Sequence, residues 1–290
     1  MNQPLPLCLL FDNGSLRPEA TLRLRTIARE LEAALGVEVR AVSLLHSSAI
    51  DPAQLGGRAA RLLGPALKAA LQSGGREFVL LPLFFGPSAA LADYVPERLS
   101  HLRAQFPAMK VRLARCLVDP AASADTRIAA ILADLVRAEI GRVGLTRPKV
   151  ALVDHGSPRR AVNVVREWLG GQMRGLLGGE IDRLETASME RRPEPEYDFN
   201  EPLLATLLQR PDFAQGDVVV ARQFFAPGRH AGMGGDIEAI CAEAQKRRAG
   251  LRIHLTGPVG GDARLIDVLA DRYREARSQN GQAPTSGGCR

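Results

Sequence analysis

Several features that mark other classes of protein are missing from this sequence. No apolar run approaches the roughly 20 residues that a membrane-spanning helix needs, so we expect no membrane partner. The N-terminal segment MNQPLPLCLLFDNG lacks the basic region and the small-residue cleavage site of a signal peptide. The four cysteines lie far apart and form no C-x-x-C motif, which argues against a disulfide framework or a cysteine metal site. These absences together favour a cytoplasmic protein.

Aromatic residues are scarce, at 4% of the chain, although the formal net charge is +6. Nucleic-acid-binding proteins with such a charge usually interleave basic runs with aromatic residues, so we expect no nucleic-acid partner. The basic residues come instead as scattered arginines and short pairs, such as Arg159-Arg160 and Arg191-Arg192. Arginine makes charge-assisted, often bidentate hydrogen bonds to carboxylates. The pattern favours a small polyanionic ligand, and a solvated basic surface is the alternative for any single arginine.

Short apolar strands alternate with amphipathic helices along the chain. This alternation is typical of α/β proteins in which helices cover both faces of a parallel sheet. In the first half, we expect strands at 7–12, 37–45, 78–85 and 110–113, and helices at 18–35, 52–73, 91–105 and 123–140. In the second half, we expect strands at 150–154, 181–188, 218–225 and 252–255, and helices at 159–176, 201–209, 236–249 and 264–277.

The two halves share motifs as well as element order. The sequence DNGS at 12–15 matches DHGS at 154–157, and FFGPS at 84–88 matches FFAPGRH at 224–230. We interpret the chain as an internal duplication that forms two tandem domains, each with a flavodoxin-like, four-stranded parallel sheet. The predicted domains are residues 1–145 and 146–277, followed by a disordered tail at 278–290 that is rich in Gly, Ser, Gln and Pro. In this alignment His155 and His230 replace Asn13 and Ser88, so at these two positions only the second half has imidazoles.

Three loops of the second half carry side chains that can bind a metal ion. His155 follows the first strand, Glu190 follows the second, and His230 lies among glycines after the third. In a parallel sheet of order 2-1-3-4, these loops lie side by side at one edge. Imidazole suits divalent iron, cobalt, nickel and zinc, and two imidazoles with one carboxylate leave coordination positions open. Taken singly, each residue also fits a structural role, because Gly156-Ser157-Pro158 can be a simple helix-capping turn and Glu190 can pair with a neighbouring arginine.

These motifs resemble those of a known enzyme family. The segment VDHGSPRRAVN at 153–163 resembles the opening motif of the class II, ATP-independent tetrapyrrole chelatases, and FFAPGRHAGMGGDIEAI at 224–240 resembles their second signature. The family includes sirohydrochlorin ferrochelatases and cobaltochelatases. The resemblance implies a lyase that inserts Fe²⁺ or Co²⁺ into sirohydrochlorin or a related anionic tetrapyrrole, in siroheme or cobalamin biosynthesis. It implies no nucleotide and no cofactor beyond the substrate metal.

The resemblance also assigns roles to individual residues. His155 and His230 match the two metal-binding histidines, and Glu190 matches an acidic residue that follows the second strand; the three are expected to bind the metal and to take part in catalysis. His46 stands at the corresponding place in the first half and is a candidate extra ligand. The substrate carboxylates are expected to contact Ser157, Arg159, Arg191 and Arg229, together with Arg160 and Arg192.

Three other functions remain compatible with the residues. The same ligands can serve a metal or tetrapyrrole carrier or sensor that does not turn over. A duplicated domain with one degenerate copy can act as a scaffold or regulator. Ser157 and His155 are also the residue types of a hydrolase, although neighbours on one turn rarely face each other and no Gly-x-Ser-x-Gly elbow is present.

Overall fold

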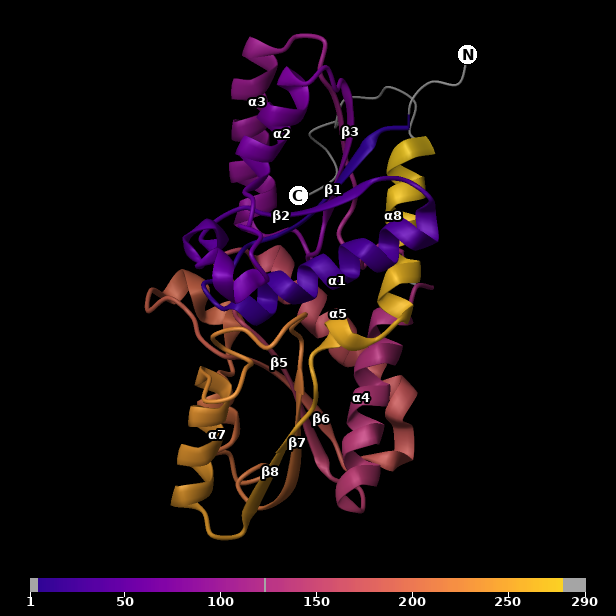
Figure 1. Cartoon of the computed structure of the whole chain (residues 1–290). Helices are drawn as coiled ribbons and strands as arrows, with labels where there is room; N and C mark the ends of the chain where they lie inside the picture. The colour runs from indigo at the N-terminus through magenta and orange to yellow at the C-terminus, as the bar shows by residue number, and fades with distance from the viewer. Residues whose placement is uncertain (1–4, 123, 279–290) are drawn as a thin grey trace. The chain divides into compact units, whose positions relative to one another are not determined.

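The computed structural model describes residues 5–122 and 124–278. The strands form two separate four-stranded parallel sheets with helices packed around them (Figure 1), which confirms the predicted α/β class and the tandem arrangement. Within the described residues, no helix is long and apolar enough to cross a membrane. The predicted tail falls outside the described residues except for Ser278, the last residue of the final helix.

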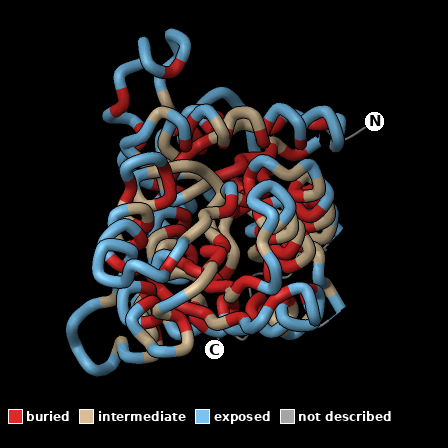
Figure 2. Tube along the Cα trace, turned by 90° about the horizontal axis from the view of Figure 1, so that it is seen from below, coloured by how far each residue is buried: buried red, intermediate tan, exposed pale blue. Residues whose placement is uncertain are grey.

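The first sheet has the strand order β2-β1-β3-β4. Its central strands are apolar on both faces, and residues 8–11 are fully buried. Figure 2 colours the chain trace by burial and shows buried and exposed segments alternating along it. Leu9 and Phe11 pack toward α2 and α3, while α1 and α8 contact each other and the sheet. The strands are β1 (Leu7–Asp12), β2 (Val39–Ser43), β3 (Glu77–Pro82) and β4 (Lys110–Leu113), and the helices are α1 (Pro18–Leu35), α2 (Leu63–Gln72), α3 (Val95–Gln105) and α8 (Arg264–Ser278).

The second sheet repeats this order as β6-β5-β7-β8, which agrees with the predicted order 2-1-3-4. Residues 150–153 of its central strand are fully buried, as are their counterparts in the first sheet. The strands are β5 (Lys149–Asp154), β6 (Leu184–Ser188), β7 (Gly216–Arg222) and β8 (Leu251–Leu255), and the helices are α4 (Arg127–Val143), α5 (Arg160–Leu177), α6 (Leu204–Leu207) and α7 (Asp236–Arg247).

The compact units do not follow the predicted boundary after residue 145. Unit 1 comprises Met1–Leu117 and Ala263–Arg290, and unit 2 comprises Val118–Asp262. Helix α4 contacts α5 and β7, and helix α8 contacts α1 and β3, so the last helix of each repeat packs in the other repeat's unit. An amphipathic helix buries its apolar face on an uncovered sheet, but its sequence pattern does not indicate which of the two sheets that is.

Two predicted helices are shorter in the structure than in the sequence interpretation. The segment predicted as one helix at 52–73 forms a 3-10 turn, η2 (Pro52–Leu55), and then α2. Gly56 and Gly57 lie between them with φ of 69° and 78°, a left-handed conformation that ends a helix. The helix predicted at 201–209 is reduced to the single turn α6.

Candidate metal centre

The turn after β5 presents His155 at the carboxyl edge of the second sheet. The Gly156 N–H donates to Oδ1 of the buried Asp154 over 3.1 Å, which closes the turn. Gly156 has φ of 90°, and a Cβ at this position would lie 1.9 Å from the carbonyl oxygen of Glu190. Only glycine therefore allows the loop after β5 to lie directly against the loop after β6.

Main-chain hydrogen bonds continue beyond the ends of β5 and β6 and bring Glu190 to His155. The Met189 N–H donates to the Asp154 carbonyl over 2.8 Å, and the Glu190 N–H donates to the His155 carbonyl over 3.2 Å. The His155 Nε2 atom lies 3.4 Å from Glu190 Oε1. Both side chains are about half exposed, so the pair stands at an accessible edge of unit 2.

The loop after β7 brings the second imidazole to the first. The ring centroids of His155 and His230 are 4.6 Å apart with an interplanar angle of 77°. The His230 Nδ1 atom lies 2.6 Å from Oδ2 of Asp236, the first residue of α7. The Ile237 N–H donates to the His230 carbonyl, so the start of α7 holds both the ring and the backbone of His230.

Asp236 contacts one of the predicted metal ligands, although the sequence interpretation gave it no role. Its signal was present, because an Asp-Ile pair follows the glycine-rich loop in the second signature segment. Of the three predicted metal ligands, His155 contacts both His230 and Glu190. Within the described part of the chain, no group of three or more His, Cys, Asp or Glu side chains is already arranged to hold a metal ion. The set of His155, Glu190 and His230 as metal ligands therefore stays a prediction.

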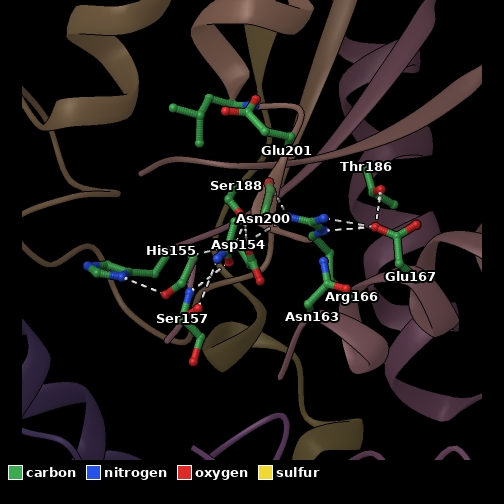
Figure 3. A network of polar contacts seen from close by, with 12 residues as sticks. Asp154, His155, Ser157, Asn163, Arg166, Glu167, Thr186, Ser188, Asn200 and Glu201 are labelled. Atoms are coloured by element: carbon green, nitrogen blue, oxygen red, sulfur yellow. Dashed lines mark hydrogen bonds and ion pairs between the residues drawn. The ribbon is translucent and has the colours of Figure 1, made fainter. Parts of the chain in front are cut away.

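A buried polar cluster around Arg166 of α5 lies behind the His155 turn (Figure 3). Arg166 is fully buried, and its Nη1 atom is 3.4 Å from Asp154 Oδ1. Arg166 also donates to Ser188 Oγ and to the Asn200 carbonyl. The Ser188 hydroxyl donates to Asp154 Oδ1 over 2.8 Å. The cluster thus joins the ends of β5 and β6 to α5, while the His155 side chain points away from it.

Asn200 connects this cluster to the turn. Its Oδ1 accepts from the Ser157 N–H over 3.0 Å, and its Nδ2 donates to the Ser157 carbonyl over 2.9 Å. On the other side of Arg166, its guanidinium donates to Glu167, whose Oε1 also accepts from the Thr186 hydroxyl. The backbone of the His155 turn is therefore held from within by hydrogen bonds to buried side chains.

The first repeat keeps the buried carboxylate but lacks the arginine. Helices α1 and α5 each have 18 residues and follow the matching turns, so Leu24 is the counterpart of Arg166. Burial raises the pKa of Asp12 to about 6, against hydrogen bonds from Ser43 and Gly14 that lower it. Burial also raises the pKa of Asp154, and the charge of Arg166 is the largest influence in the opposite direction.

The hydrogen-bonded register corrects two alignments made from the sequence. Gly14 approaches the Leu45 carbonyl as Gly156 approaches that of Glu190, so Leu45 is the counterpart of Glu190 and His46 follows one residue later. The exposed His46 is therefore not at the corresponding place.

The second correction concerns His230. Phe11 pairs with Pro82 and Val153 pairs with Arg222 in equivalent registers, which makes Gly228, rather than His230, the counterpart of Ser88. The alignment made from the sequence used one constant offset between the halves. The strand register gives a smaller offset in this loop, so that alignment matched Ser88 with the wrong residue.

The predicted substrate-binding residues have varied surroundings. The Ser157 hydroxyl accepts from the Arg159 N–H and supports the helix start. Arg191 pairs with Glu201 at 2.8 Å and with Asp198 at 3.1 Å, so its charge is offset within its own loop. Arg229 is 76% exposed beside the imidazoles, with its Nε atom 4.0 Å from Asp236. The guanidinium groups of Arg160 and Arg192 lie over the rings of Phe199 and Tyr197, respectively.

Sequence comparison matches the repeat that carries both histidines. A profile of the CbiX family matches residues 149–276. Over 129 residues, the chain is 31% identical to the chloroplastic sirohydrochlorin ferrochelatase of Arabidopsis thaliana, an alignment that covers 44% of this chain and 52% of that protein. The chain thus spans about half the length of this curated relative.

Solved structures match the fold over nearly the whole chain. SirB from Bacillus subtilis with Fe³⁺ matches with a TM-score of 0.65 at 14% identity, covering 94% of this chain and 96% of that chain. The sirohydrochlorin chelatase SirB from Bacillus subtilis subspecies spizizenii, in complex with cobalt, matches with a TM-score of 0.68 at 12% identity, covering 96% of this chain and 98% of that chain. A multi-domain protein of Deinococcus radiodurans with structural similarity to chelatases matches with a TM-score of 0.59 at 17% identity, covering 95% of this chain and 56% of that chain.

The two α/β repeats thus have the same fold as these solved chelatase structures. In this chain the histidine-bearing loops lie at one edge of the second sheet. The CbiX profile matches only the second repeat, residues 149–276, and this match confirms the resemblance seen in the motifs of that repeat.

Proposed function

We propose that this protein is a chelatase that inserts a divalent metal ion, Fe²⁺ or Co²⁺, into sirohydrochlorin or a related anionic tetrapyrrole. The proposal is carried by the contact between His155 and His230, whose ring centroids are 4.6 Å apart. A metal–imidazole bond is about 2 Å long, so two rings bound to one metal at about 90° have centroids about 4.5 Å apart. The two rings therefore have the spacing of neighbouring ligands on one ion.

The hydrogen bonds of both rings favour metal binding through Nε2. His230 Nδ1 faces the Asp236 carboxylate and His155 Nδ1 faces the Gly156 carbonyl at 3.1 Å, and both partners are acceptors. In the neutral form of each ring these acceptors favour the tautomer with the proton on Nδ1, which leaves a lone pair on Nε2. His155 Nε2 then faces a Glu190 oxygen at 3.4 Å, and two such electron-rich atoms are stabilised by a shared cation.

Insertion into a tetrapyrrole also requires two pyrrole protons to leave. Glu190 is about half exposed and next to His155, which makes its carboxylate the proposed proton acceptor. The macrocycle brings its own carboxylates, and Arg229 is the exposed guanidinium beside the imidazoles. We assign Arg229, with Arg159, to the substrate carboxylates, because arginine binds them in a bidentate manner.

The comparisons support the reaction class and leave two metals open. The Arabidopsis relative is a sirohydrochlorin ferrochelatase, and SirB structures contain Fe³⁺ or cobalt. Imidazole and carboxylate ligands suit both iron and cobalt. The product is therefore either an iron or a cobalt tetrapyrrole, which belongs to siroheme or cobalamin biosynthesis, respectively.

Anaerobic insertion of Fe²⁺ or Co²⁺ into sirohydrochlorin, followed by absorbance, tests the proposal. We expect multiple turnovers by the native protein and at least a 100-fold lower rate for His155→Ala and for His230→Ala. His46→Ala is the matched control, because it removes an exposed imidazole from the first repeat, and it should retain the native rate. Metal binding without turnover would identify a carrier instead and would refute the chelatase proposal.

A further inference from the structure

Unit 1 contains a cavity of about 1030 Å³ that none of the proposed metal-centre residues lines. Helix α1 and strand β2 form two of its walls, and residues 55–61, which begin at the end of η2, form the third. Part of the inner surface is apolar, because Leu24, Ala28 and Leu55 are almost fully buried there, next to the buried hydroxyls of Thr21 and Ser43. A ligand in this cavity would therefore contact an apolar surface with one part of its structure.

The charged residues that line the cavity are nearly all cationic. They comprise five arginines and a single glutamate, Glu32. The Glu32 carboxylate accepts from the Val39 N–H over 2.8 Å, so it is already engaged. The arginines are Arg25, Arg29, Arg40, Arg58 and Arg61.

These arginines fall into two groups with different partners. Arg40 pairs with Glu38 at 2.6 Å. Arg25 donates to the carbonyls of Leu55, Arg58 and Ala59, which holds the segment 55–61 against α1 without cancelling any charge. Burial and the nearby charge of Arg58 lower the pKa of Arg25.

Arg29, Arg58 and Arg61 form the other group. Within residues 5–122, their guanidinium groups have no acidic partner. The cavity thus combines an apolar surface with three guanidinium groups whose charge is not compensated. Sites for organic ligands have this composition, in which a few convergent polar groups surround an apolar surface.

The second repeat shows that this charge is not a requirement of the fold. Helix α5 aligns with α1, β6 aligns with β2, and Pro202 accepts from Ser188 as Arg61 accepts from Ser43. None of the aligned positions is basic in the second repeat. The counterparts are Glu167 for Arg25, Gly171 for Arg29, Glu185 for Arg40 and Pro202 for Arg61.

We propose that this cavity is a binding site for a small organic polyanion, with the apolar body of the ligand on the inner surface and its carboxylates or phosphates on Arg29, Arg58 and Arg61. Arginine forms strong bidentate hydrogen bonds with both kinds of anionic group. The repeat without the paired imidazoles has arginines here instead, which gives it a ligand site of its own. The site does not depend on the reaction proposed for His155 and His230.

Calorimetric titration of the full-length, metal-free protein tests this site. One probe is mellitate, a benzene ring with a carboxylate on every carbon, and the other is inorganic tripolyphosphate, which has no apolar body. We expect saturable binding of at least one probe, weakened at least about tenfold in Arg29→Glu/Arg61→Glu. Among the residues that the structure describes, these two side chains have no acidic partner, so the variant should keep the native melting temperature. Tighter binding of mellitate would identify a carboxylate ligand, and tighter binding of tripolyphosphate a phosphate ligand.

Two control variants separate a specific site from bulk attraction and from the metal centre. Arg17→Glu/Arg23→Glu changes the net charge equally at positions outside the cavity lining. His155→Ala/His230→Ala removes the paired imidazoles. Both should bind within twofold of the native protein. Equal weakening by Arg17→Glu/Arg23→Glu, loss of binding in the histidine variant, unchanged binding in Arg29→Glu/Arg61→Glu, or no saturable binding would each overturn the proposal.

Discussion

The Nδ1 atom of His230 lies 2.6 Å from Oδ2 of Asp236 at the start of α7. A carboxylate in this position sets the orientation and tautomer of a histidine and increases the basicity of its other nitrogen. The glycine-rich loop at 231–235 connects the two residues. The Ile237 N–H also donates a hydrogen bond to the His230 carbonyl. The ring that meets His155 is therefore positioned by α7.

Asp236→Asn tests this positioning. The amide cannot supply the negative charge, so we expect Co²⁺ affinity to fall about 10–100-fold, the usual effect of removing such a partner. Titration of the full-length protein with Co²⁺ measures it. The control is Glu243→Gln on the same helix, where the carboxylate pairs with Arg247 on the surface, and its affinity should stay native. Equal Co²⁺ affinity in the native protein and Asp236→Asn would contradict the role given to Asp236.

Gly156→Ala should damage both stability and the metal centre. The new Cβ would meet the Glu190 carbonyl at 1.9 Å, at a φ of 90° that alanine disfavours. We expect a loss of about 2 kcal/mol or more in the free energy of unfolding. Gly14→Ala is matched to it, because its Cβ would meet the Leu45 carbonyl at 1.8 Å at a φ of 92°. Urea denaturation should show similar losses for both, but only Gly156→Ala should weaken Co²⁺ binding; an equal effect on binding would refute the assignment of the site to the second repeat.

Replacing Arg166 by leucine gives this position the residue that the first repeat has at its counterpart, Leu24. Removing the arginine leaves Asp154 without its cation in the interior, so we expect a loss of about 3 kcal/mol in the free energy of unfolding. Because the cluster holds the His155 turn, Co²⁺ affinity should also fall about tenfold or more. The measurements are urea denaturation and Co²⁺ titration.

The control for Arg166 is Arg174→Leu on the same helix. Arg174 donates to the Leu184 carbonyl at the beginning of β6, at the opposite end of that strand from Ser188. This variant should bind Co²⁺ with native affinity. For a milder test, Asn200→Ala removes the two hydrogen bonds to Ser157 and should weaken Co²⁺ binding in a protein that stays folded. If both Arg166→Leu and Asn200→Ala bound Co²⁺ as the native protein does, the positioning role would be wrong.

Asp12 should make unit 1 sensitive to pH. Its pKa is about 6 in the folded chain against the usual 3.8, so the folded state holds the proton more tightly. The contribution of this group to stability is therefore fully present below about pH 4 and is lost as the pH rises through 6. Asp12→Asn removes this dependence. The difference in the free energy of unfolding between this variant and the native protein should shift in favour of the variant by on the order of 2 kcal/mol from about pH 4 to pH 8. Urea denaturation measures it, and a difference that does not change with pH would exclude the effect.

The sheets and the paired imidazoles are the parts of the structure that the sequence predicts best. Runs such as residues 150–153 are apolar throughout, as central parallel strands must be, and the duplicated motifs give the same order twice. His155 and His230 follow strands that flank each other in that order, which brings their loops together. Local pattern and strand order suffice for these features.

Other features depend on packing that local patterns do not encode. The exchange of α4 and α8 between the units is invisible in their periodicity, because both have an ordinary amphipathic pattern. Arg166 stands in a helix whose other arginines are exposed or partly exposed, so its burial against Asp154 appears only in three dimensions. The cavity of unit 1 likewise joins α1 to residues 55–61, which lie outside the motifs that the two halves share.

X-ray absorption spectroscopy of the Co²⁺-loaded, full-length protein measures the central contact most directly, since it counts the imidazoles bound to the metal. If His155 and His230 bind one ion, the native protein shows two imidazole ligands and each single alanine variant shows one. Native protein with one imidazole or none, or a spectrum that stays the same in His155→Ala/His230→Ala, would contradict the account.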